Sequence, residues 1–186
     1  MARVFVITGP SGVGKGTLIR NLLSRVSGLE LSVSATTRKP RPGEEDGVHY
    51  HFLTDEQFEE RVRDGAFVEH ADYSGRRYGT LRSELERRTA GGVPVVLEIE
   101  VQGARQVRET LPDAVQVFIV PPSEEALRER LVGRGTDSSD DVERRLKVAE
   151  EELTARDEFQ YQVVNDRLED AVEELERIVQ SELPTG

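Results

Sequence analysis

Apolar positions along this chain follow two different periods. Short, nearly continuous apolar runs, typical of strands buried in a parallel sheet, cover residues 3–8, 29–33, 93–99, 114–120 and 161–164. Helical spacing of apolar residues covers residues 15–26, 101–110, 124–132 (after an N-cap at Ser123), 141–156 and the segment from the turn at 165–166 to about 181. Because strands and helices alternate, the pattern predicts an α/β fold with an open parallel sheet and helices on both faces.

Two segments interrupt this alternation. Residues 35–90 contain turn signals, short strand-like pieces and one helix near 55–64, and they are too long for a loop. Residues 133–140, rich in glycine and hydroxyl side chains, lie between two expected helices and are typical of a mobile lid. We therefore expect a core of residues 1–34 and 91–186, with a lid at about 133–145 within it, and an inserted lobe over 35–90.

A glycine-rich loop joins the first strand to the first helix. The loop consists of Gly9, Pro10, Ser11, Gly12, Val13, Gly14, Lys15, Gly16 and Thr17. A strand, loop and helix in this order turn backbone N–H groups and a helix N-terminus toward a phosphate. Lys15 can reach the outer phosphates of a nucleotide as a point charge. We therefore expect a P-loop, with a glycine turn that binds nothing as the structural alternative.

The loop departs from the usual P-loop in one place. The usual pattern has Ser or Thr directly after the lysine, where the hydroxyl contacts Mg²⁺. Here Gly16 takes that position, and the hydroxyl follows at Thr17. This variant resembles the loop of adenylate kinases, so the loop alone does not select the substrate. Thr17 is the candidate metal contact, directly or through water.

Composition narrows the classes of partner. A formal net charge of −11 makes the chain a poor general binder of nucleic acids or of anionic membranes. The absence of cysteine excludes disulfides and thiolate zinc sites. No apolar run is long enough for a bilayer, and the N-terminus lacks the regions of a secretory signal. We expect a cytoplasmic monomer or homodimer with no nucleic-acid or membrane partner. The glutamate runs at 150–152 and 173–174 are expected to be solvated helix faces.

Arginines and hydroxyls gather at the start of the expected lobe. Arg38 and Arg41 are three residues apart in a loop with Pro and Gly, and the nearby hydroxyls are those of Ser34, Thr36, Thr37 and Tyr50. Two planar guanidinium groups and a phenol suit a phosphate monoester, which is close to doubly charged at neutral pH. A solvated basic loop is the alternative.

Residues 36–50 match throughout the pattern T-T-R-x-P-R-x-G-E-x-x-G-x-x-Y, and so they resemble the monophosphate loop of guanylate kinases. Further segments resemble the family in order and at similar spacing, at 67–69, 78–80, 97–103, 134–138, 144–146 and 163–166. The resemblance covers nearly the whole chain. It implies a P-loop NTPase-type parallel sheet that carries a monophosphate-binding lobe and a short lid.

The implied activity is transfer of the γ-phosphoryl group of ATP to GMP, and to dGMP as well, with Mg²⁺ bound to ATP. By resemblance, Arg38, Arg41, Tyr50 and Tyr78 hold the monophosphate, and Thr80 and Glu100 contribute to base or ribose. Glu98 is also expected among the GMP-binding residues. Guanine has two neighbouring donors that adenine lacks. A carboxylate at Glu69 that accepts from both, with Ser34 donating to O6, would select guanine.

The same resemblance assigns residues around the transferring group. Lys15, Arg38, Arg134 and Arg145 would converge on it. Glu98 and Glu100 end a buried strand near the P-loop, where carboxylates can order Mg²⁺ through water, although the family often has Asp at the position of Glu100. Asn165 would lie on the adenine side of ATP.

Two alternatives remain open. Catalytically inactive guanylate-kinase-like domains act as scaffolds that bind phosphopeptides, but they typically have a degraded P-loop and a changed residue at the position of Ser34. Here Gly14, Lys15, Ser34, Arg38 and Arg41 are all present. A kinase of another nucleoside monophosphate is favoured only by Gly16.

Overall fold

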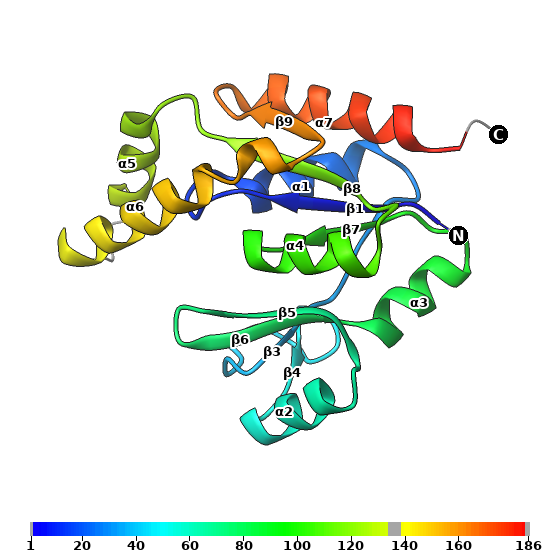
Figure 1. Cartoon of the computed structure of the whole chain (residues 1–186). Coiled ribbons are helices and arrows are strands. Elements are labelled where there is room, and N and C mark those ends of the chain that lie inside the picture. Colours follow the sequence, from blue (N-terminus) through cyan, green and yellow to red (C-terminus); the bar gives the residue numbers. More distant parts are fainter. Residues whose placement is uncertain (1, 134–138, 185–186) are drawn as a thin grey trace.

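A five-stranded parallel sheet forms the centre of the computed structural model, which describes residues 2–133 and 139–184 (Figure 1). Its strands lie in the order β2-β7-β1-β8-β9, and every neighbouring pair is parallel. They are β1 (Val4–Thr8), β2 (Glu30–Leu31), β7 (Val95–Glu98), β8 (Val115–Val120) and β9 (Tyr161–Val164). The expected parallel sheet is therefore confirmed, although β2 is shorter than the apolar run that predicted it.

Helices cover both faces of this sheet. On one face, α1 (Lys15–Arg25) and α7 (Leu168–Glu182) pack on strand residues such as Phe5 and Ile7. On the other face, α4 (Val101–Thr110) packs on Val6 and Leu97. Successive residues of β1 thus supply two separate cores, as the two-residue period of a strand requires.

Two further helices lie beside the carboxyl edge of the sheet. They are α5 (Glu124–Val132) and α6 (Ser139–Leu153), which share a small apolar cluster. The predicted cap is present, since the Ala126 N–H donates to the Ser123 hydroxyl over 3.1 Å. The helix expected at 141–156 begins and ends earlier, and a 3₁₀ turn at Arg156–Glu158 follows it. Most of the expected lid, residues 134–138, lies outside the described residues.

The segment 35–90 forms a second sheet, seen below the central sheet in Figure 1. Its strand order is β4-β3-β6-β5, from β3 (Ala35–Thr36), β4 (His51–Phe52), β5 (Phe67–Tyr73) and β6 (Arg76–Leu81). The expected helix is α2 (Asp55–Arg63), whose Phe58 stacks on Phe67 at 4.5 Å between ring centroids. We call this segment the lobe.

The expectation of a single helix in the lobe segment is wrong, because α3 (Arg82–Ala90) follows β6. This helix buries only Glu84 and Leu85. Its nine residues contain only two apolar ones, Leu85 and Ala90, which give no helical period that sequence analysis could detect.

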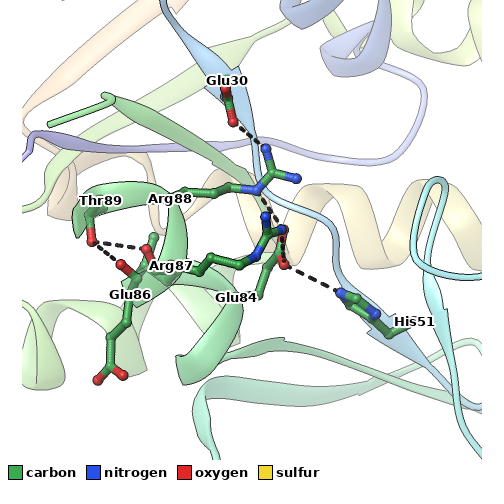
Figure 2. Close-up of polar contacts among 8 residues, drawn as sticks. Glu30, His51, Glu84, Glu86, Arg87, Arg88 and Thr89 are labelled. Carbon is green, nitrogen blue, oxygen red and sulfur yellow. Dashed lines mark hydrogen bonds and ion pairs between the residues drawn. The ribbon is translucent and has the colours of Figure 1, made fainter. Parts of the chain in front are cut away.

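A charged network at α3 joins the lobe to the core (Figure 2). The buried Glu84 carboxylate accepts from Arg88 at 2.5 Å and Arg87 at 2.8 Å, and it lies 3.6 Å from His51 Nε2 on β4. Arg88 also pairs with Glu30 on β2. Burial alone would raise the pKa of Glu84, but the hydrogen bonds from Arg87 and Arg88 outweigh it and hold the pKa at about 2. The network thus fastens three segments at one joint.

Helix α4 forms a second junction between core and lobe. The Gln106 side chain donates to the His70 carbonyl at 2.7 Å and accepts from the His70 N–H at 3.0 Å. The Thr110 hydroxyl donates to the Val68 carbonyl at 3.3 Å. These bonds hold β5 against α4 on both sides of Glu69. Among the described residues, no helix has the length and apolar character needed to cross a bilayer.

Candidate active site

The glycine-rich loop lies at the carboxyl end of β1, where ligands bind in parallel sheets. Gly14 precedes α1 with a φ of +93°, and a Cβ there would come within 2.8 Å of the Asn165 amide nitrogen. That amide donates to the Val13 carbonyl over 2.8 Å. Asn165, which the sequence placed near adenine, therefore braces the loop from behind.

Lys15 is buried within this loop, with 8% of its surface exposed. Its ammonium group donates to the Gly9 carbonyl and lies 3.8 Å from a carboxylate oxygen of Glu100. The lysine thus connects the loop to the end of β7.

A pair of carboxyl groups, Glu100 and Glu152, borders the loop. Among the described residues, one buried oxygen of each carboxyl has no hydrogen-bond donor. Burial and the neighbouring Glu100 raise the pKa of Glu152, while the backbone N–H of Ser11 counteracts that rise. Orphaned carboxylate oxygens beside a phosphate-binding loop are a donor set that suits a hard cation such as Mg²⁺.

The hydroxyl of Thr17 is also near the loop, on the exposed side of α1, and it accepts from Arg20 at 3.1 Å. Within residues 2–133 and 139–184, no group of three or more His, Cys, Asp or Glu side chains could form a protein cage for a metal. The chain thus offers a few oxygens beside the loop, as expected for an ion held mainly by nucleotide phosphates and water.

A cavity of about 280 Å³ lies between the lobe and the ends of the core strands. Six of the residues that the sequence assigned to GMP line it, namely Ser34, Tyr50, Glu69, Tyr78, Glu98 and Glu100. Ser34 directly precedes the lobe, Tyr50 lies just before β4, Glu69 and Tyr78 lie on β5 and β6, and Glu98 and Glu100 lie at the end of β7. Glu100 connects this cavity wall to the P-loop, because one of its carboxyl oxygens lies 3.8 Å from the Lys15 ammonium group.

Glu69 is the most buried carboxyl group in the cavity wall, with 3% of its surface exposed. Burial raises its pKa to about 7, despite a 2.7 Å hydrogen bond from the Thr80 hydroxyl. Thr80 itself is buried behind Glu69, with 1% exposed. A carboxyl group held in this way can accept two hydrogen bonds from a flat ligand with adjacent N–H donors.

The two arginines of the lobe differ in position. Arg38 grips the Glu44 carboxylate through both terminal nitrogens, at 2.8 and 2.9 Å, and its guanidinium lies 5.1 Å from the Tyr50 ring centroid. Tyr50 in turn meets Tyr78 edge-on at 6.3 Å. Arg41 is exposed, and its backbone N–H donates to Glu44 at 2.7 Å. Arg38 therefore already holds a planar pair of anionic oxygens, the geometry that a phosphate would also offer.

The predicted arginines of the lid region can be placed only in part. Arg145 on α6 donates to the Ser11 hydroxyl at 2.9 Å, so it reaches the P-loop. Arg134 lies outside the described residues.

Sequence analysis missed two residues at this site. Tyr73 lines the cavity and its hydroxyl contacts the Ser11 side chain from the tip of the β5–β6 hairpin. The turn residues Ser74 and Gly75 both have positive φ, +52° and +73°. A Ser-Gly pair between two strand-like runs could have indicated this hairpin and so the position of Tyr73.

The second missed residue is Glu152, which had been assigned to a solvated run. It is partly buried against the P-loop. It follows Val142, Leu146 and Ala149 on the buried stripe of α6, so helical spacing was the available signal.

Comparison with known proteins gives independent evidence on the family of this chain. The sequence model of the family "Guanylate kinase" matches residues 1–182. A guanylate kinase of Synechococcus sp. (strain CC9311) is 53% identical over 177 residues, covering 95% of this chain and 93% of that protein. A guanylate kinase of Rubrobacter xylanophilus is 54% identical over the same number of residues, with the same coverage.

The fold agrees with a solved structure. The crystal structure of guanylate kinase from Anaplasma phagocytophilum is 32% identical in sequence and superposes with a TM-score of 0.78, covering 99% of this chain and 87% of that one. Sequence, fold and cavity lining thus point in one direction: the chain belongs to the guanylate kinase family.

Proposed function

We propose that this chain transfers the γ-phosphoryl group of ATP to GMP, and to dGMP, producing ADP and the nucleoside diphosphate. One observation carries the proposal: the buried Glu69 carboxyl and Glu100 line the same cavity, and Glu100 lies 3.8 Å from the ammonium group of Lys15. We infer that a site for the base adjoins a site for the triphosphate. The family comparisons favour neither a scaffold nor a kinase of another monophosphate.

The donor side consists of the P-loop and its supports. Backbone N–H groups of residues 9–17 and the N-terminus of α1 would bind the ATP phosphates, and Lys15 would neutralise the outer ones. Asn165 would keep the loop in shape through the Val13 carbonyl. Arg145, with Arg134, would reach the transferring group from the α6 side.

The acceptor side consists of the lobe. Glu69, supported by Thr80, would accept from the two guanine donors, and Ser34 would donate to O6. Arg38, Arg41, Tyr50 and Tyr78 would hold the monophosphate. Since the Arg38 fork is filled by Glu44, GMP would compete with that carboxylate or share the guanidinium with it.

Positioning accounts for most of the chemistry. A phosphate dianion is already a nucleophile, so no general base is assigned, and the in-line attack needs alignment and charge neutralisation. Closure of the lobe and lid would exclude water that could otherwise accept the phosphoryl group. Bound Mg²⁺ would add charge neutralisation at the ATP oxygens. Thr17, Glu98, Glu100 and Glu152 are the residues that would hold it, partly through water. We place this reaction in the cytoplasm, carried out by a monomer or homodimer.

The direct test is ADP formation from ATP and Mg²⁺ with GMP, dGMP, AMP, CMP or UMP as acceptor. We expect rapid turnover with GMP and dGMP and little with AMP. A folded chain that turns over none of them would overturn the proposal and direct attention to phosphopeptide ligands.

A further inference from the structure

We propose that Gly103 is a specificity-determining position, where the lack of a side chain leaves room for the Glu69 carboxyl against helix α4. The inference rests on the proposed role of Glu69 as the residue that recognises guanine. It concerns a residue that touches no substrate and acts only through Glu69. Gly103 is therefore a positioning residue.

The surroundings of Gly103 explain why it is glycine. A Cβ placed there would overlap the Glu69 Oε2 atom and lie 3.1 Å from its Cδ. Gly103 lies inside α4 and does not have the positive φ of a turn glycine such as Gly65, around which there is open space. A glycine inside a helix costs about 1 kcal/mol relative to alanine. Glycine is needed here despite this cost, because the Glu69 carboxyl occupies the space that a Cβ would take.

The neighbouring contacts leave the Glu69 side chain as the part that must yield. Strand β5 cannot readily retreat from α4, because Gln106 makes two hydrogen bonds to the backbone of His70. On the other side, Thr80 holds the second carboxyl oxygen at 2.7 Å. The end of a flexible side chain moves at lower cost than a strand that is hydrogen-bonded to a helix side chain. An added methyl group would therefore displace the carboxyl and leave the fold in place.

Displacement of this carboxyl would directly weaken recognition of the base. Two hydrogen bonds to one planar base require both carboxyl oxygens in the plane of the base, and misplacement by about 1 Å can cost on the order of 10²-fold. The ATP side would be spared, since Gly103 lies on the lobe-facing side of α4. The expected signature is a loss confined to the monophosphate.

The experiment compares Gly103→Ala with the unmodified enzyme, using KM for GMP, KM for ATP and the melting temperature. We expect KM for GMP to rise at least about tenfold, with KM for ATP within twofold and Tm equal or higher, because alanine favours the helix. Glu109→Ala, at an exposed position of the same helix, is the matched control and should change neither constant. An unchanged KM for GMP, or equal losses for both substrates with a lower Tm, would overturn the proposal.

A second variant tests the cause. In a Glu69→Asp background the carboxyl is one methylene shorter, so Gly103→Ala should cost much less there than in the native background. Should Gly103→Ala fail to fold, adding Glu69→Ala removes the overlapped group and should restore Tm. Absence of that rescue would show that the overlap is not the cause.

Failure of the proposed function would look different. Turnover of GMP by the unmodified chain is measured first and tests that function alone. If GMP is turned over but Glu69→Gln keeps the full preference for GMP over AMP, the role of Glu69 and the proposal for Gly103 are both overturned while the activity stands.

Discussion

At the scale of single residues, the protonation of Glu69 links the structure to the acidity of the solution. Burial raises its pKa to about 7, whereas guanine donors require the ionised form. Folding shifts this pKa upward from 4.5, so the folded chain binds more protons than the unfolded chain between these values. The contribution of Glu69 to stability is therefore present at low pH and is lost as pH rises through about 7.

Recognition of GMP should depend on pH in the opposite direction. We expect kcat/KM for GMP to fall below pH about 7, approaching tenfold per unit, because free enzyme with protonated Glu69 must first lose that proton. The phosphate of GMP ionises near pH about 6 and adds a second limb. Rate profiles of the Glu69→Gln variant should keep the second limb and lack the first. Superimposable profiles for the two proteins would contradict the assignment.

Arg38 provides a prediction about charge geometry. Arg38→Ala should lower kcat/KM for GMP by at least about 10²-fold, because a charged fork on a phosphoryl oxygen is lost. Arg38→Lys should recover only part of this, since an ammonium group cannot hold two oxygens in one plane. Arg63→Ala, at an exposed position of α2, serves as the control in steady-state assays. Activity of Arg38→Ala within a few-fold of the unmodified enzyme would reject the role.

The sequence allowed the cavity residues to be named but not their support. The resemblance to guanylate kinases pointed to Glu69, Tyr50 and Tyr78, which the structure brings to one cavity. The positions of Thr80 behind Glu69 and of Glu152 against the P-loop depend on how β6 and α6 pack on other elements. No local pattern encodes such distances.

At the scale of elements, the periodicity of apolar residues predicted the helices that pack through an apolar face. Helix α4 has the bounds that its apolar spacing indicated, and α5 begins at its predicted cap. Helix α3 was missed because it buries the Glu84 carboxylate and one apolar side chain, Leu85, rather than a stripe of apolar side chains. Charge pairing of this kind leaves no period in the sequence.

The joint at α3 should be sensitive to loss of Glu84. Glu84→Ala removes the acceptor of Arg87 and Arg88, and we expect a loss of at least about 2 kcal/mol in the free energy of urea unfolding. Glu86→Ala is the matched control, since the Glu86 carboxylate points away from the network in Figure 2 and is exposed.

The same joint makes a contribution to the stability of the fold that depends on acid pH. Because the folded pKa of Glu84 is about 2, below the ordinary 4.5, its contribution is present above 4.5 and is lost as pH falls toward 2. The difference in stability between the unmodified chain and Glu84→Ala should therefore shrink across this range. A difference that is constant from pH 6 to pH 2 would contradict the assignment.

At the scale of the whole molecule, two sheets meet at one cavity and are joined through α3 and α4. Hydrogen exchange can separate their responses. GMP alone should protect amides of the lobe, a non-hydrolysable ATP analogue should protect residues 9–17, and only both together should reduce the radius of gyration in X-ray scattering. Full compaction with GMP alone would contradict a closure that requires both substrates.

The parallel pairing of β2 with β7 determines how the lobe of such a chain can be exchanged. Parallel neighbours need a crossover connection, and here the entire lobe, which ends with α3, lies within that connection. The lobe is therefore a segment that could be replaced by another, which would give the same ATP-binding core a new phosphoryl acceptor. A chimaera cut at residues 34 and 91 would, however, leave Gly103 and Gln106 behind. A transplanted lobe must bring its own α4 if it is to keep its choice of base.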